Sequence, residues 1–127
     1  MPEEETAKDD AKQEQKLAYL EGISQAKLGL RSSSRSLTSL RGHADDDDTR
    51  IIDLQLDQND SDWFRANRAE GAYYSGNVKF RAPKPEELAS MRGLVTYLDG
   101  VIVGNEQVRD VIAATTTLVQ HFNATQA

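Results

Sequence analysis

Apolar residues recur at alternating steps of three and four near both ends of this 127-residue chain. Near the N-terminus the series is Tyr19, Ile23, Ala26, Leu30, Ser33, Leu37 and Leu40. Near the C-terminus it is Leu88, Met91, Val95, Leu98 and Ile102, and then Val108, Val111, Thr115, Leu118 and Phe122. This spacing forms a narrow apolar seam along an α-helix, and such a seam must be buried against another helix. We therefore expect helical seams that close within the chain or against a partner.

The seams and the residues that break helices predict a mostly α-helical fold. A long helix is expected over 13–41, ending before Gly42. A C-terminal helical hairpin is expected over 85–123, with Pro85 in its first turn. Its first helix should run to about Val103, and the second should begin after Gly104 and Asn105. The expected architecture is a coiled-coil-like bundle that forms a single domain over 13–127.

The remaining segments predict little regular structure. Residues 1–12 are acidic with nothing large to bury, which favours a disordered opening. Residues 42–84 read as an irregular middle segment in which Asp45 to Asp48 form a self-repelling, solvated loop. The run from Ile51 to Leu56 suits either a short strand or a helix start, since periodicity does not separate the two. A short helix is expected from about Ser61 to Glu70.

A small β-hairpin or an extended loop is expected just before the C-terminal helices. Tyr73, Tyr74, Val78 and Phe80 flank Ser75, Gly76 and Asn77, a composition compatible with two short strands and a turn. A lone hairpin is marginally stable in water, so it would have to lie on the helices.

The charge and the cysteine content narrow the classes of function. A formal net charge of −6 disfavours broad adhesion to nucleic acid or to anionic membranes. With no cysteine there is no disulfide and no thiolate metal site. No apolar run is long enough to cross a bilayer, and the acidic N-terminus lacks the apolar core of a secretory signal. We expect no membrane insertion and a cytoplasmic protein, or one exported by a signal-independent route.

One basic stripe is the sharpest charge feature of the sequence. Lys27, Arg31 and Arg35 are four residues apart on one helical face, with no acidic residue between Glu21 and Asp45. The stripe suits an anionic partner, and together with Arg41 it supports an alternative hypothesis of a nucleic-acid-associated regulator. The preferred interpretation is an exposed face balanced by nearby carboxylates.

The sequence offers no pattern for catalysis, cofactor binding or metal binding. Asp45 to Asp48 lack the alternating ligands, glycine and terminal glutamate of a calcium loop. The two histidines, His43 and His121, have no paired ligand spacing and suit surface or helix-end positions. Neither a phosphate-binding loop nor a dinucleotide glycine pattern occurs. We expect no enzymatic activity, no cofactor, no metal and no small-molecule substrate.

The hypothesis from the sequence is therefore a non-enzymatic protein–protein interaction protein. It would act as an assembly subunit, an adaptor or a small chaperone, with a protein partner or a second copy of itself. The residues expected to carry the contact or the core are Ile23, Leu30, Leu37, Leu40, Leu88, Val95, Leu98, Val111, Leu118 and Phe122. Trp63, Phe64, Tyr73 and Tyr74 suit either partner anchors or, preferably, a structural cap at the end of a thin bundle.

Overall fold

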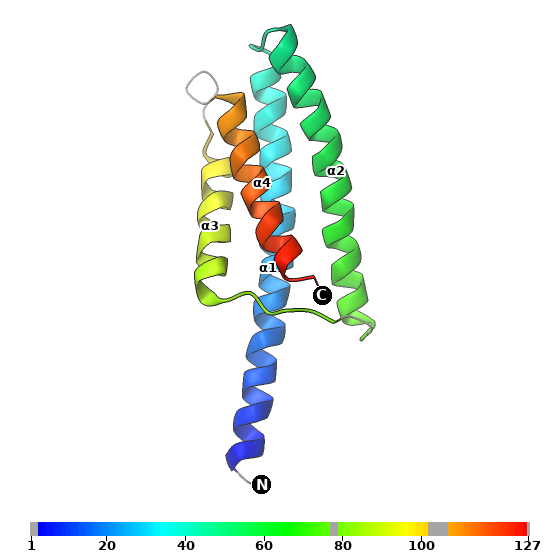
Figure 1. Ribbon diagram of the computed structural model, residues 1–127, viewed down its shortest axis with the longest axis vertical. Helices are drawn as coiled ribbons and strands as arrows, with labels where there is room; N and C mark the ends of the chain where they lie inside the picture. The colour runs from blue at the N-terminus through cyan, green and yellow to red at the C-terminus, as the bar shows by residue number, and fades with distance from the viewer. Residues whose placement is uncertain (1–2, 77–78, 102–106, 127) are drawn as a thin grey trace.

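A computed structural model describes residues 3–76, 79–101 and 107–126 of the chain. The described residues form four helices: α1 (Glu3–Arg41), α2 (Asp46–Tyr74), α3 (Pro85–Asp99) and α4 (Val108–Ala124). They run alternately up and down the bundle, and the N-terminal part of α1 projects beyond the other three helices (Figure 1). The mostly α-helical prediction is confirmed.

Helix α1 is the centre of the bundle. It contacts α2, α3 and α4, whereas α2 and α3 do not touch each other. Helix α4 packs against α1 and α3 and more sparsely against α2. The apolar seams of α1, α3 and α4 therefore face one another inside the chain, and their side chains form one continuous core.

One end of α1 lies where the sequence predicts it, and the other does not. The helix ends at Arg41 before Gly42, as predicted. It begins at Glu3, however, so the predicted disordered opening over 1–12 is wrong for residues 3–12. Residues 3–16 are mostly strong helix formers, and a helix already nucleated by packing gains one hydrogen bond for each residue it adds.

The predicted irregular middle segment is wrong, because α2 spans 29 residues of it. The Asp45 side chain caps the helix by accepting a hydrogen bond from the backbone N–H of Asp48 at 2.8 Å. The aspartates 46–48 lie in the first turn, where the positive end of the helix dipole favours them, and do not form a loop. The predicted short helix over 61–70 lies in the C-terminal half of this longer one.

The core-facing stripe of α2 explains why the sequence did not reveal it. Ile52, Asn59 and Ala66 are buried at intervals of seven, and the half-buried Tyr73 continues the series. A polar and a small residue occupy two of these four positions, so the apolar periodicity is interrupted. Both the strand and the short helix start considered for Ile51 to Leu56 give way to this long helix.

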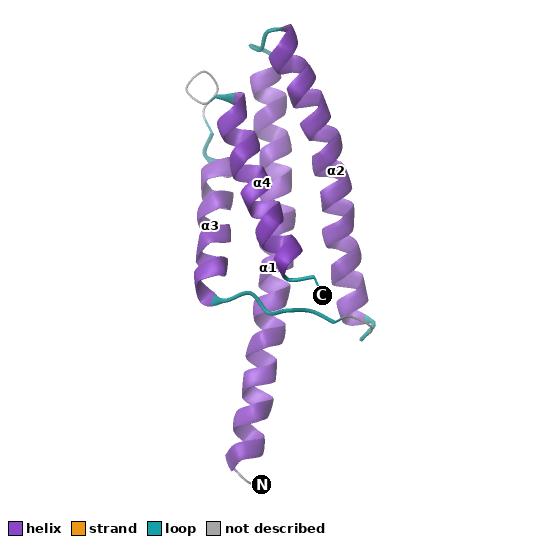
Figure 2. Cartoon of the chain, in the orientation of Figure 1, coloured by secondary structure: helices purple, strands orange, loops and turns teal. Residues whose placement is uncertain are grey.

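The small β-hairpin is not present among the described residues, which contain helices and loops (Figure 2). Tyr73 and Tyr74 end α2, and Phe80 forms an isolated antiparallel bridge with Gln126. The predicted turn and second strand include Asn77 and Val78, which lie outside the described residues. Tyr73 and Phe80 pack with Tyr19, and the ring centroids of Tyr19 and Phe80 are 4.2 Å apart. Of the four aromatic residues considered as anchors, Tyr73 therefore has a structural role.

The C-terminal hairpin of helices agrees with the prediction in type. Helix α3 begins at Pro85 and ends at Asp99, about four residues before the predicted end, with Gly100 as its C-cap. The predicted breaks at Gly104 and Asn105 lie outside the described residues. Helix α4 ends one residue beyond the predicted Asn123.

Helix α4 packs closely against α1 at a glycine. A Cβ atom placed on Gly29 would lie 2.1 Å from Leu118 Cδ2 and 3.2 Å from Val95 Cγ2. Leu118 therefore occupies the space that a side chain on this glycine would fill. This close approach offsets the cost of about 1 kcal/mol that glycine imposes on a helix interior.

A buried polar cluster joins three helices one turn further along α1. The Ser33 hydroxyl lies 2.7 Å from Thr115 Oγ1 on α4, and Asn59 Nδ2 on α2 donates to Ser33 Oγ at 3.0 Å. Gln55 Nε2 donates to Asn59 Oδ1 at 2.9 Å, so the amide of Asn59 is satisfied on both sides. These bonds define the axial register of α2 and α4 on α1, because a shift of any helix would leave buried polar groups unpaired.

A bulkier residue at the glycine contact should destabilise the bundle. We expect Gly29→Val to lower the free energy of unfolding by about 2–3 kcal/mol, because Leu118 and Val95 cannot both move away in a packed core. The matched control is Gly93→Ala, because a Cβ atom at this position meets nothing within 4 Å. This substitution should raise the free energy of unfolding by about 0.5–1 kcal/mol. Urea unfolding measures both, and equal effects of the two substitutions would contradict the close approach.

The polar cluster makes a second prediction. Asn59→Ala should lower the free energy of unfolding by about 2 kcal/mol, because it removes hydrogen bonds to Ser33 and Gln55 and leaves a void. Asn67→Ala on the same helix removes an exposed bond to Lys27 and should change stability by less than about 0.5 kcal/mol. Thermal unfolding of the two variants gives the comparison, and an unperturbed Asn59→Ala would show that the cluster does not hold the helices.

Candidate functional site

The residues predicted to carry association lie in the core of the single chain. Nine of the ten are buried: Ile23, Leu30, Leu37, Leu40, Leu88, Leu98, Val111, Leu118 and Phe122. The tenth, Val95, is half-buried and packs against them. The seams thus close within one chain, and their role in binding a partner stays a prediction. A contact surface for a folded partner must therefore include residues outside this set.

The three residues of the basic stripe contact different groups on neighbouring helices. Lys27 Nζ lies 3.5 Å from Glu70 Oε1 and donates to Asn67 Oδ1 at 2.9 Å. Arg35 pairs with Asp99 at the end of α3. Arg31 instead lies over the ring of Trp63, with its guanidinium carbon 5.1 Å from the ring centroid.

Arg41, at the end of the same helix, forms a two-pronged pair with Asp53. Its Nε and Nη2 donate to the two carboxylate oxygens at 2.8 and 3.2 Å. These hydrogen bonds lower the pKa of Asp53 below its usual value and raise that of Arg41. Both side chains are exposed, so the pair contributes little to stability. Its main effect is that Asp53 offsets the positive charge of Arg41.

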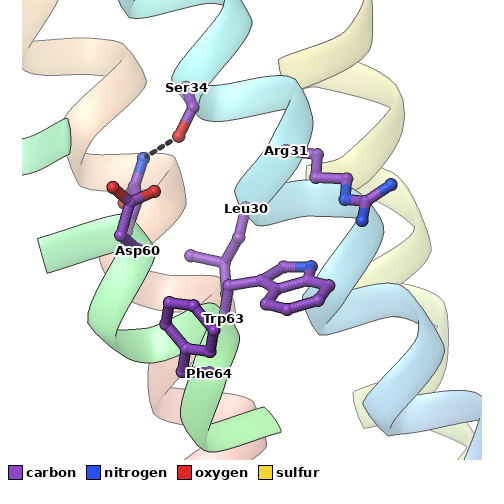
Figure 3. A pocket seen from close by; sticks show the side chains of 7 residues that line it. Leu30, Arg31, Ser34, Asp60, Trp63 and Phe64 are labelled. Atoms are coloured by element: carbon purple, nitrogen blue, oxygen red, sulfur yellow. Dashed lines mark hydrogen bonds between the residues drawn. The ribbon is translucent and has the colours of Figure 1, made fainter. Parts of the chain in front are cut away.

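A groove between α1 and α2 combines a depression with aromatic and charged side chains, and is the candidate site in the described part of the chain. Leu30, Arg31 and Ser34 of α1 and Asn59, Asp60, Trp63 and Phe64 of α2 line a depression of about 270 Å³ (Figure 3). Arg31 lies on its α1 side and Asp60 on its α2 side, with Leu30 and Trp63 between them. No residue of α3 or α4 lines it, so this face of the α1–α2 pair is open.

The groove continues past Trp63 along the two helices. A second depression of about 190 Å³ is lined by Ser24, Lys27, Leu28, Arg31, Trp63 and Glu70. Two large apolar side chains stand exposed along this groove, Phe64 at 60% and Leu28 at 51%. The rings of Phe64 and Trp63 meet edge to face, with centroids 5.6 Å apart.

Trp63 is held firmly although it borders solvent. Lys27 Nζ lies 4.9 Å from its ring centroid, on the same ring that Arg31 contacts. Such cation–π contacts contribute about 0.5–1 kcal/mol each at exposed sites. Its indole N–H is buried without a hydrogen-bond partner among the described residues. The tryptophan therefore lies between the two depressions and lines both of them.

The sequence located part of this groove. Its pattern marks Trp63 and Phe64 as either partner anchors or, preferably, a structural cap, and places Arg31 in the basic stripe. Leu28 and Asp60 were missed, since neither lies in a motif. A correct assignment of α2 would have placed Asp60, Trp63 and Phe64 on neighbouring faces of one helix, because residues three and four apart are adjacent.

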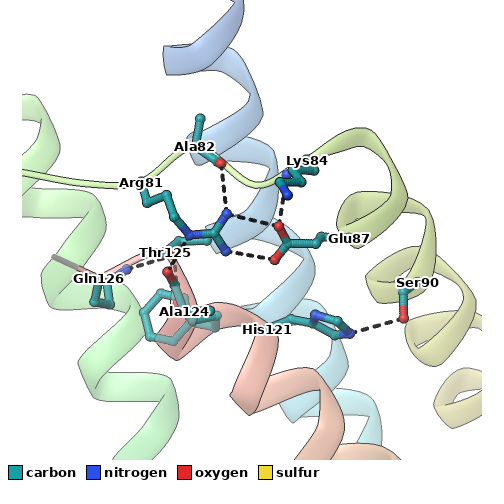
Figure 4. A network of polar contacts seen from close by, with 10 residues as sticks. Arg81, Ala82, Lys84, Glu87, Ser90, His121, Ala124, Thr125 and Gln126 are labelled. Atoms are coloured by element: carbon teal, nitrogen blue, oxygen red, sulfur yellow. Dashed lines mark hydrogen bonds and ion pairs between the residues drawn. The ribbon is translucent and has the colours of Figure 1, made fainter.

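A second polar network joins the C-terminus to the start of α3 (Figure 4). Arg81 donates through Nη1 and Nη2 to the two oxygens of Glu87 at 3.0 and 2.8 Å, and through Nε to the carbonyl of Ala124 at 2.9 Å. The Glu87 carboxylate also accepts from the backbone N–H of Lys84 at 3.2 Å. These hydrogen bonds lower the pKa of Glu87 from 4.5 to about 2, and those from the Arg81 guanidinium have the largest effect.

The histidines occupy the predicted kinds of position. His43 is exposed in the turn after α1. His121 lies in the last turn of α4, with Nε2 3.1 Å from the Ser90 hydroxyl of α3. Ser90 and His121 therefore join α3 to α4, and no carboxylate orients the imidazole among the described contacts.

The described residues contain no group of three or more histidine, aspartate or glutamate side chains arranged to hold a metal ion. Within the same ranges, no helix combines the length and the apolar character needed to cross a membrane.

Comparisons with protein-family models, with curated proteins and with solved structures gave no match. The groove and the network must therefore be interpreted from their own chemistry.

The Arg81–Glu87 pair predicts a pH dependence of stability. Because the pKa of Glu87 is lowered in the folded state, its contribution is complete above about pH 4.5 and is lost as the pH falls to about 2. Glu87→Gln should therefore be less stable than the parent protein at pH 7, by about 0.5–1 kcal/mol, and equally stable near pH 2. Thermal unfolding across this range tests the prediction, and a difference that does not depend on pH would contradict it.

Proposed function

We propose that this chain is a non-enzymatic protein–protein interaction protein whose docking surface is the α1–α2 groove. The observation that carries the proposal is the exposure of Phe64 and Leu28 on either side of the half-buried Trp63. Large apolar side chains that gather on an otherwise polar surface are typical of protein-binding sites. An assembly subunit, an adaptor or a small chaperone would each use such a surface.

The composition of the groove fits the centre of a protein interface. Tryptophan, tyrosine and arginine dominate the residues that contribute most binding energy at interfaces, and the groove contains Trp63 and Arg31 with Phe64 beside them. Trp63 is already held by Lys27 and Arg31, so little conformational entropy would be lost on binding. A depression of about 270 Å³ suits one or two side chains of a partner helix.

The distribution of charge favours this function over the nucleic-acid-associated regulator. That alternative relies on Lys27, Arg31, Arg35 and Arg41 acting together on phosphates. Three of these four are bonded to carboxylates of α2 or α3, which offset their positive potential. Arg31 alone among them is available to an anionic group, and it lies beside an apolar groove.

Site-specific photo-crosslinking tests the proposal. A benzoylphenylalanine in place of Phe64 should give a discrete adduct with a polypeptide in cells that express the protein, because this exposed position lines the groove. The matched control places the same group at Ala89, an exposed position on α3. Adding Leu28→Asp to the Phe64 variant should reduce the yield roughly tenfold, as expected for a central interface residue.

The proposal fails if no polypeptide adduct forms at position 64, or if adducts form equally at position 89. It also fails if Leu28→Asp leaves the yield unchanged while circular dichroism shows the same helix content.

A further inference from the structure

The charges around the groove indicate what docks there. Among the described residues, neither Arg31 nor Asp60 forms an ion pair or a side-chain hydrogen bond, although both line the same depression. Two neighbouring cations along the same helices are paired, Lys27 with Glu70 and Arg41 with Asp53. The lining of this depression thus presents one unpaired cation, Arg31, on its α1 side and one unpaired anion, Asp60, on its α2 side, with Leu30 and Trp63 between them (Figure 3).

Resting on the proposed function, we infer that the α1–α2 groove binds the same groove of a second copy, in a two-fold dimer whose axis runs parallel to the helices. A two-fold interface brings the same surface patch of both copies together, so the patch must complement itself. A surface with opposite charges on its two sides and apolar side chains between them meets that requirement.

The direction of the axis follows from the charges. A two-fold axis parallel to the helices sets α1 of each copy over α2 of the other and keeps residues at the same height. Arg31 of one copy then faces Asp60 of the second, and the reverse contact forms as well. An axis across the helices would set α1 over α1 and α2 over α2, which brings like charges together and costs affinity.

The apolar side chains fit the same arrangement. With α2 of one copy over α1 of the other, Phe64 of each copy faces the α1 side of the opposite groove, where Leu30 and Arg31 line the depression. Phe64 would then lose its exposure to water and gain a guanidinium neighbour.

The length of the pair of helices provides enough surface. Twenty-nine residues of α2 beside the matching part of α1 form a face about 40 Å long and about 20 Å wide. That area is comparable with the roughly 800 Å² that each partner buries in a standard protein interface.

Charge reversal tests both the occupant and the geometry. Sedimentation at physiological ionic strength should give a molar mass twice the 14.1 kDa of the chain. At this ionic strength, repulsion between two chains of charge −6 is screened beyond about 8 Å. Arg31→Glu and Asp60→Arg should each weaken the dimer by on the order of a hundredfold, because each creates two like-charge contacts. Arg109→Glu, at an exposed position of α4, is the control and should leave the mass unchanged.

Two restorations make the test specific. The double variant Arg31→Glu with Asp60→Arg should dimerise again, since both contacts are restored with exchanged signs. An equimolar mixture of the two single variants should form a mixed dimer, because one partner presents two anions and the other two cations. Circular dichroism on each variant confirms that the helices remain intact.

Each other outcome overturns the inference. A parent protein of 14.1 kDa at every concentration excludes the dimer. If the single variants stay dimeric, the interface lies elsewhere. If their mixture stays monomeric, Arg31 of one copy does not face Asp60 of the other. The proposed function is judged separately: an adduct at position 64 with a different polypeptide supports it while the self-association fails, and no adduct overturns both.

Discussion

The close contact between α1 and α4 at Gly29 is the constraint on which the rest of the bundle depends. Leu118 occupies the space above this glycine, and one turn further along, Ser33 bonds to Thr115 and Asn59. Apolar packing alone would tolerate sliding of one helix along another, whereas hydrogen bonds between buried groups specify one position. Helix α1 can therefore contact three helices in a single register.

This arrangement leaves one face of the α1–α2 pair open. Helix α4 reaches the far side of α1 and α2 through Thr115 and Leu118, and α3 packs on the other flank of α1 without touching α2. Trp63 and Phe64 therefore border solvent even though neighbours on their helix are buried. The surface proposed for docking is a direct consequence of a bundle in which α2 has few neighbours besides α1.

The seams of α1, α3 and α4 could be read from the sequence because each is a nearly unbroken series of apolar residues, such as Leu30 and Leu37. Helix α2 could not, because Asn59 and Ala66 occupy core positions where a periodicity analysis expects large apolar residues. The same reason hid the groove: Asp60 and Leu28 belong to no motif and acquire a role only when α1 and α2 lie side by side.

By itself the sequence determined that the chain is mostly helical and which faces of α1, α3 and α4 are apolar. Local spacing sets which face of a helix must leave water, so these properties need no knowledge of the neighbours. The tertiary structure decided that the seams close within one chain, that Lys27 and Arg35 meet carboxylates, and that Arg31 and Asp60 do not. Those outcomes depend on which helices become neighbours, because a buried seam or a paired charge is defined by residues distant in the chain.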